Sequence, residues 1–166
     1  MKAKIQIIIV LLFTAIGSVY AQNPIPKGQT QLNFGLGLNS YNIPIYFGLD
    51  QGVGNNISLG GELSLQGQRH ADHLHTIVGI FGNGNYHFND VLDIPRNWDF
   101  YAGLNLGFYL YSNRYENRAY FGRSSGIGLG GQLGGRYYFN NKAGINLEFN
   151  AGNYFAGGKF GLSFRI

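Results

Sequence analysis

The placement of charge within its alternating segments constrains the fold of this chain most strongly. Eight segments beyond residue 28 alternate between apolar residues and small or polar residues, which is the period of a β-strand. They are residues 31–38, 45–50, 57–66, 76–88, 100–111, 127–139, 145–150 and 159–166. Their charged residues all share the face of Gly, Ser, Asn and Gln, and these are Asp50, Glu62, Arg136, Glu148, Lys159 and Arg165. Each predicted strand therefore offers one apolar face without charge.

The direction of the apolar face separates a soluble barrel from a membrane barrel. The interior of an eight-stranded barrel is barely wide enough to be filled by side chains, so it cannot hold all the Leu, Ile and Phe residues of this face. Only 12% of the residues are charged, against about 25% in a typical soluble domain. The apolar face is thus expected to contact lipid, where unpaired backbone groups are costly and a sheet must close. The sequence predicts an all-β fold, an eight-stranded antiparallel up-and-down transmembrane β-barrel.

The predicted connections differ between the two ends of the barrel. Residues 52–56 and 140–142 are tight Gly/Asn turns, whereas 67–75 and 112–125 are longer and polar. If the first strand starts on the periplasmic side, both long loops face the outside, as is usual in such barrels, and 89–97 is an unusually long periplasmic turn. Pro44 is expected at the external rim of the second strand. An aromatic girdle is expected at the periplasmic ends, from Tyr86, Phe88, Trp98, Phe100, Tyr137, Phe139 and Phe164.

The N-terminal residues predict export. Lys2 and Lys4 precede an apolar run over 5–16, and cleavage after Ala21 would leave Gln22 as the new N-terminus. The alternative, a membrane-anchoring helix, needs about 20 apolar residues, more than this run provides. We therefore expect a signal peptide over 1–21 and a barrel domain over 22–166, with a short linker at 22–28. The chain has no cysteine, which excludes a lipid-modified cysteine, thiolate metal sites and disulfides.

Two segments carry a resemblance to known proteins. Residues 98–104 read Trp-Asp-Phe-Tyr-Ala-Gly-Leu, and the chain ends in Phe160, Leu162, Phe164 and Ile166 at alternating positions. The chain resembles the small eight-stranded outer-membrane barrels, that is the OmpX-like proteins and the membrane part of OmpA, and the first segment is similar to Bacteroidetes outer-membrane β-barrel domains. The terminal pattern looks like the signal read by the barrel-assembly machinery, although Ile166 stands where an aromatic residue is commoner. The resemblance implies an outer-membrane location, with outer-membrane lipids, lipopolysaccharide and the assembly machinery as partners.

The inward charges allow two interpretations. Glu62 and Glu148 are expected to be neutralised by Arg136 and Arg165, because a buried charge is tolerable only when it is paired. A filled, structural lumen is favoured, since small barrels tend to be filled. The many inward glycines leave a narrow pore for ions or small solutes as the alternative.

Two loop motifs offer chemistry beside simpler interpretations, and one glycine-rich segment does not. His70, Asp72, His73 and His75 could bind zinc or copper, although their spacing matches no known motif and the loop could simply be polar. Residues 114–123 mix Arg114, Arg118 and Arg123 with aromatics, which suits lipopolysaccharide phosphates or a partner's surface, or else a solvated loop. The glycines of 126–131 continue a strand rather than open a helix, so they do not indicate a nucleotide site.

An enzyme is the rival class. Some barrels of this size modify lipid A, which requires a nucleophile or base near the outer rim. Here the sequence shows no Ser with a nearby His and Asp or Glu, and His87 falls near the periplasmic end. A soluble ligand-binding barrel is a further alternative. We expect a monomer without catalytic residues, cofactor or bound metal. No nucleic-acid partner is expected, because beyond Ala21 ten basic residues balance eight acidic ones without clustering.

Overall fold

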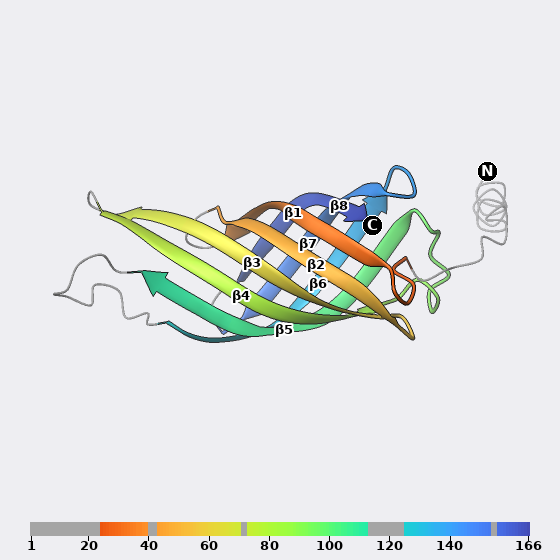
Figure 1. Ribbon diagram of the computed structural model, residues 1–166, viewed down its shortest axis with the longest axis horizontal. Helices are drawn as coiled ribbons and strands as arrows, with labels where there is room; N and C mark the ends of the chain where they lie inside the picture. The colour runs from red at the N-terminus through yellow and green to blue at the C-terminus, as the bar shows by residue number, and fades with distance from the viewer. Residues whose placement is uncertain (1–23, 40–42, 71–72, 113–124, 154–155) are drawn as a thin grey trace, which may run out of the picture.

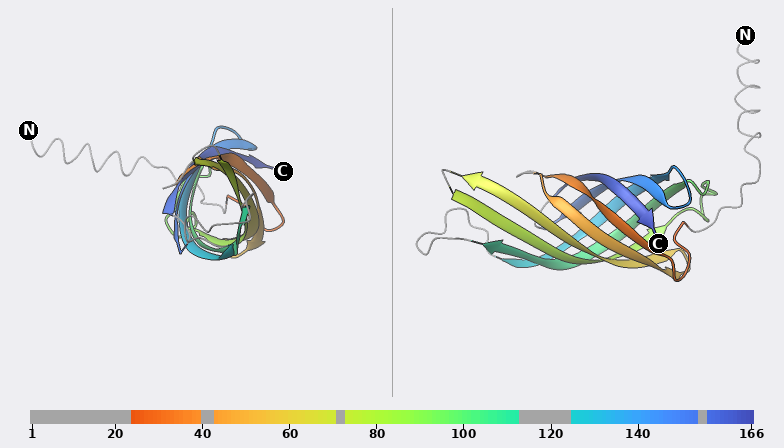
Figure 2. Two further views of the ribbon diagram at one scale, coloured as in Figure 1. Left: turned by 90° about the vertical axis from the view of Figure 1, so that its left-hand side faces the viewer. Right: turned by 45° about the horizontal axis from the view of Figure 1, so that its top comes forward.

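Eight antiparallel strands form one closed barrel in the computed structural model (Figure 1). The structure describes residues 24–39, 43–70, 73–112, 125–153 and 156–166. Each strand pairs with its neighbours in sequence, and the first strand pairs with the last (Figure 2). The strands are β1 Thr30–Asn39, β2 Ile45–Gly54, β3 Ile57–His70, β4 His73–His87, β5 Trp98–Ser112, β6 Gly126–Tyr138, β7 Ala143–Gly152 and β8 Ala156–Arg165. The predicted fold class and strand number are confirmed.

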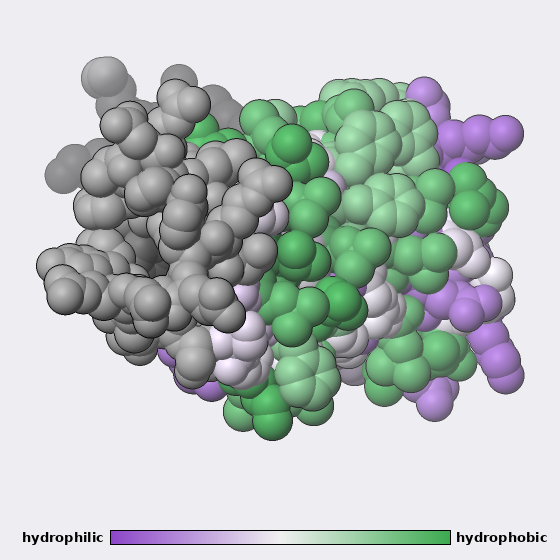
Figure 3. All heavy atoms as spheres, turned by 60° about the vertical axis from the view of Figure 1, so that its left-hand side comes forward, coloured by the Kyte–Doolittle hydropathy of each residue, from purple (hydrophilic) through white to green (hydrophobic). Residues whose placement is uncertain are grey.

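The apolar residues line the outside of this barrel. In β2 the burial alternates residue by residue, with Ile45, Phe47 and Leu49 exposed and Tyr46 and Asp50 buried. The same alternation places Leu, Ile and Phe on the outer wall in all eight strands. Figure 3 shows this apolar wall, with polar residues gathered at one end. Such a surface suits an apolar solvent and not water.

The two ends of the barrel differ, and we call them the terminal end and the loop end. The terminal end holds the start of β1 and the end of β8, and its connections at 55–56, 88–97 and 139–142 follow the predicted pattern, including the one longer turn. Asn55 and Asn56 adopt positive φ values of 54° and 60° in the tight β2–β3 turn, a conformation that Asn tolerates well. The loop end holds the other connections.

One prediction about the loop end is wrong. Residues 67–75 do not form a long loop, because β3 and β4 continue until His70 pairs with His73. β2 begins at Ile45, opposite Leu65, so the β3–β4 hairpin extends beyond the start of β2. The polar composition of residues 67–75 predicts a loop, but a strand that has left the apolar layer can continue through polar residues. The other predicted long loop, over 112–125, lies between the end of β5 and the start of β6 and falls mostly outside the described residues.

The aromatic residues predicted for the girdle gather at the terminal end. Trp98 stacks on Phe100 with ring centroids 5.6 Å apart, and it also contacts Tyr137 at 4.8 Å. Similar contacts join Tyr86 to Phe88. At the loop end, Pro44 directly precedes β2, as predicted, and its carbonyl accepts a hydrogen bond from the Gly37 amide. Within the described residues, no helix is long and apolar enough to cross a membrane.

The polar lumen as the candidate functional site

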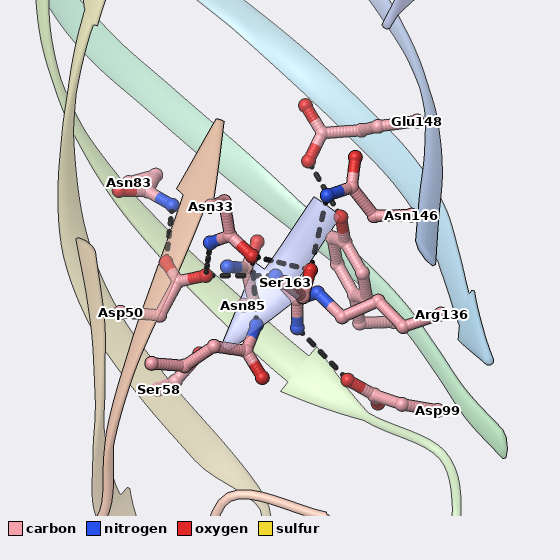
Figure 4. A network of polar contacts seen from close by, with 12 residues as sticks. Asn33, Asp50, Ser58, Asn83, Asn85, Asp99, Arg136, Asn146, Glu148 and Ser163 are labelled. Atoms are coloured by element: carbon pink, nitrogen blue, oxygen red, sulfur yellow. Dashed lines mark hydrogen bonds and ion pairs between the residues drawn. The ribbon is translucent and has the colours of Figure 1, made fainter. Parts of the chain in front are cut away.

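The inward faces of the strands form a polar lumen that holds nearly all of the buried charge. Since every second residue of each strand points inward, the inward side chains of the eight strands are enough to fill a barrel this narrow. Figure 4 shows the central part, with Asn33, Asp50 and Asn83 on one side and Arg136 and Asp99 across from them. Two ion-pair clusters organise this network.

The arginine cluster consists of Arg136, Asp50 and Asp99. Arg136 is 2% exposed, and its two terminal nitrogens lie 2.7 Å from Asp50 Oδ2 and 2.8 Å from Asp99 Oδ2. Its guanidinium also lies 4.1 Å from the centroid of the Tyr101 ring, a cation–π distance. The planar guanidinium reaches two carboxylates at once because it presents several donors in a fixed fork. The cluster ties β2, β5 and β6 together across the lumen.

The lysine cluster consists of Lys159, Glu62 and Glu148, and it lies nearer the loop end. Lys159 Nζ is 2.6 Å from one oxygen of each glutamate. Tyr101 donates a hydrogen bond to the other oxygen of Glu148, at 2.7 Å. Between the two clusters lies a polar cavity with room for about one water molecule. Each cluster has two carboxylates for one cation, so the lumen is mildly acidic and closely packed.

The predicted pairing of the inward charges is wrong in its partners. The two glutamates pair with Lys159 and not with an arginine, and Arg136 pairs with two aspartates. Arg165 lies over the Tyr138 ring, 3.4 Å from its centroid. Asp99 escaped the sequence analysis because the fifth strand was started one residue late. The expectation that buried charges are neutralised inside the lumen holds for Arg136 and Lys159.

The segment that precedes β1 packs into the terminal mouth. Ile25 is fully buried, and its carbonyl oxygen packs against the inward face of Gly52, where a side chain would collide with it at 2.3 Å. Hydrogen bonds from Gly28 N to Gly52 O and from Gly52 N to Gln29 O hold the segment on β2. Gly28 makes the turn with a φ of 87°. We call residues 24–29 the terminal plug.

A serine, a histidine and an aspartate come together beneath the terminal plug, which corrects the expectation that no such set exists. His87 Nε2 lies 2.9 Å from Ser58 Oγ, and His87 Nδ1 lies 2.7 Å from Asp99 Oδ1. All three side chains are fully buried. Because Ser58 and His87 are 29 positions apart and lie on adjacent strands, only the barrel register reveals their contact.

The other candidates of the sequence analysis lie outside the described part of the chain. The structure does not describe the side chains of His70, Asp72, His73 and His75, nor Arg114, Arg118 and Arg123. Among the residues that the structure does describe, no group of three or more His, Asp or Glu could hold a metal ion.

Solved structures supply the comparison with known proteins. No protein-family model matches the sequence, and no curated protein matches it either. The outer-membrane protein OprG of Pseudomonas aeruginosa is similar, with a TM-score of 0.64, 9% identity, and coverage of 87% of this chain and 98% of that one. The N-terminal barrel domain of OprF from the same organism gives 0.59, with 14% identity over 84% and 98% of the two chains.

A third similar structure is Ail of Yersinia pestis, solved in a phospholipid bilayer nanodisc. It has a TM-score of 0.57 and 10% identity, and the alignment covers 84% of this chain and all of Ail. Each of the three compared chains is covered almost completely, so the likeness concerns the whole barrel and not a shared hairpin. At these identities the likeness concerns the fold. This chain therefore has the fold of the small eight-stranded outer-membrane β-barrels.

Proposed function

We propose that this chain is an integral outer-membrane barrel with a mostly filled lumen, and that it serves envelope integrity or surface contact through its loop end. The observation that carries the proposal is the inverted distribution of polarity. The outer wall is apolar, while Arg136, Lys159 and their carboxylate partners are buried inside. A wall of this kind is stable in hydrocarbon, and a lumen of this kind supports the wall and does not conduct freely.

The proposal places the terminal end in the periplasm and the loop end outside the cell. Both chain ends of the barrel lie at the terminal end, where the tight turns also lie. Short periplasmic turns and longer outer connections are typical of such barrels. The predicted signal peptide over 1–21 would export the chain, and the assembly machinery would insert it as a monomer among lipids and lipopolysaccharide.

The β3–β4 hairpin supports a role in surface contact. It continues beyond the start of β2, so it raises one side of the barrel above the rim. A strand that extends beyond the apolar layer has a cost in protein synthesis and in the ordering of the chain. The extra length does not help the barrel to insert into the membrane. Ail, which shares the fold, carries the name attachment invasion locus protein. We therefore assign the contact surface to this hairpin and to residues 113–124, with lipopolysaccharide phosphates as the first partner to test for the arginines of that segment.

Two measurements test the proposal. The absence of native cysteine allows a single cysteine at residue 71 or at Asn141, and a membrane-impermeant maleimide should label only the first in intact cells. The opposite labelling would refute the orientation. In a planar bilayer, the folded barrel should stay silent, with its change in gel mobility on heating as the check that it folded. Reproducible conductance steps would instead establish the narrow pore as the function.

A further inference from the structure

The terminal ends of three neighbouring strands place Ser58, His87 and Asp99 in one line. Ser58 is the second residue of β3, His87 is the last of β4, and Asp99 is the second of β5. The 2.9 Å contact of Ser58 Oγ with His87 Nε2 and the 2.7 Å contact of His87 Nδ1 with Asp99 are the distances of a nucleophile, a general base and an orienting acid. Such a set is identified by geometry and roles, and not by the order of its residues in sequence.

The partners of Asp99 fix the roles of the two imidazole nitrogens. One carboxylate oxygen of Asp99 accepts the Nδ1 proton of His87, and the other binds Arg136 at 2.8 Å. The neutral imidazole that carries its proton on Nδ1 leaves Nε2 as an acceptor for the Ser58 hydroxyl. His87 is thereby held in the tautomer that a general base requires.

A fourth group completes the arrangement. Asn85 lies directly opposite Ser58 in the β3–β4 register, and both side chains point into the lumen. Gln132 donates a hydrogen bond to Asn85 Oδ1, which orients the amide. The Nδ2 group of Asn85 is buried and has no hydrogen-bond partner among the described residues. Cross-strand neighbours have Cβ atoms about 5 Å apart, so this orphan donor is close enough to Ser58 to be the candidate donor to an oxyanion on a Ser58 adduct.

We propose that Ser58 is an activated nucleophile and that the terminal mouth is an acyl-transfer site for short-chain carboxylic esters, closed by the terminal plug. Two observations support the closure. Ser58 is fully buried. The carbonyl groups of Ile25 and Pro26 lie against the inward face of Gly52, which is the cross-strand neighbour of Ser58. The plug contributes one fully buried butyl side chain, that of Ile25, which is the reason for assigning short acyl chains. This inference goes beyond the proposed function and does not depend on it.

The reaction balances without an oxidant or a cofactor. Ser58 Oγ attacks the ester carbonyl carbon as its proton passes to His87 Nε2, and Asn85 Nδ2 donates to the resulting oxyanion. The intermediate expels the alcohol, which takes the proton from His87 and leaves an acyl-Ser58. Water then attacks this ester with His87 again as the base, which releases the carboxylic acid and restores the serine. The net change is hydrolysis of one ester bond.

The test compares protein with the terminal plug in place and protein with the plug displaced. Purified wild-type barrel and the Ile25→Gly and Gly52→Ala variants are treated with a biotinylated fluorophosphonate, and the modified peptide is located by mass spectrometry. Gly52→Ala displaces the plug independently, because its new methyl group collides with the backbone of Ile25. We expect an adduct on Ser58 that forms faster in both variants than in wild type. A folded variant without an adduct on Ser58 would overturn the inference.

Matched substitutions separate catalysis from simple exposure of a serine. In the Ile25→Gly background, His87→Asn should slow the adduct by about 100-fold, since a general base contributes at least that much. Asn85→Ala should lower kcat for p-nitrophenyl butyrate by about 100-fold with little change in KM. Ser163 is equally buried, and among the described residues its side chain hydrogen-bonds to Asn33 and Asn146, so Ser163→Ala should leave the rate unchanged. An adduct rate that His87→Asn does not alter would show a structural hydrogen-bond chain and refute the proposal.

Discussion

Replacing Arg136 with alanine should destabilise the barrel more than any other single change to the lumen charges that we consider. The guanidinium is buried and bridges two carboxylates at 2.7 and 2.8 Å. Removing one partner of a buried ion pair costs about 3–5 kcal/mol, because the remaining charge stays buried without compensation. Here two carboxylates, on Asp50 and Asp99, lose their cation together.

The remaining contacts of the two carboxylates place the loss near the lower end of that range. Asp50 keeps hydrogen bonds of 2.8 Å from the side-chain amides of Asn33 and Asn83. Asp99 keeps its 2.7 Å contact with His87. These groups compensate part of the charge, whereas the contact of Arg136 with the Tyr101 ring is lost outright. We expect the free energy of unfolding to fall by about 3 kcal/mol.

Urea unfolding in lipid vesicles measures this loss. Trp98 is the only tryptophan and lies in the aromatic girdle, so its fluorescence reports on the barrel, with gel mobility on heating as the independent probe. Arg165→Ala is the matched control, because no ion pair of Arg165 occurs among the described residues, and it should cost about 1 kcal/mol. Arg136→Lys should cause an intermediate loss of stability, since the ammonium group of lysine cannot reproduce the fixed set of donors of the guanidinium. A loss at Arg136 no larger than at Arg165 would refute the reasoning.

Two further predictions concern packing inside and outside the wall. Gly134→Ala should cost about 1–3 kcal/mol, because the new Cβ would lie 2.2 Å from the buried Tyr101 ring, whereas Gly131→Ala meets its nearest atom at 3.8 Å and should be neutral in the same urea assay. Leu106→Arg should cost about 2–4 kcal/mol and reduce insertion into vesicles, because Leu106 lies near the middle of the lipid-facing side of β5, while Leu106→Ala should insert normally. Normal insertion of the arginine variant would contradict the assignment of the outer wall.

The fold was predictable from sequence because period-two alternation reports directly on which face of a strand each residue occupies. The apolar run of β5, from Phe100 to Leu110, is exposed on the wall as expected. The faces of Glu62, Arg136 and Lys159 were also correct, since parity alone decides the face. Strand ends were less predictable, as the continuation of β3 to His70 shows.

The contacts within the lumen were not predictable, because they depend on how far each strand is shifted along the barrel. Parity places Arg136 inside, but only the stagger of the strands brings it to Asp50, 86 positions away, and not to a glutamate. The same holds for Ser58 and His87, which a single sequence cannot relate. Asn85 illustrates the limit, since an orphan amide can be recognised only when all of its neighbours are known.

The seam between β1 and β8 sets the order in which the barrel can form. Seven of the eight seams join strands that are adjacent in sequence, so each can form as a local hairpin. The remaining seam joins residues such as Asn33 and Ser163, which are 130 positions apart. Pairings between distant residues form slowly, because the entropy of closing the long loop is lost before any contact compensates it. We therefore expect closure to be the last and slowest step of folding, preceded by an open sheet with two unpaired edges.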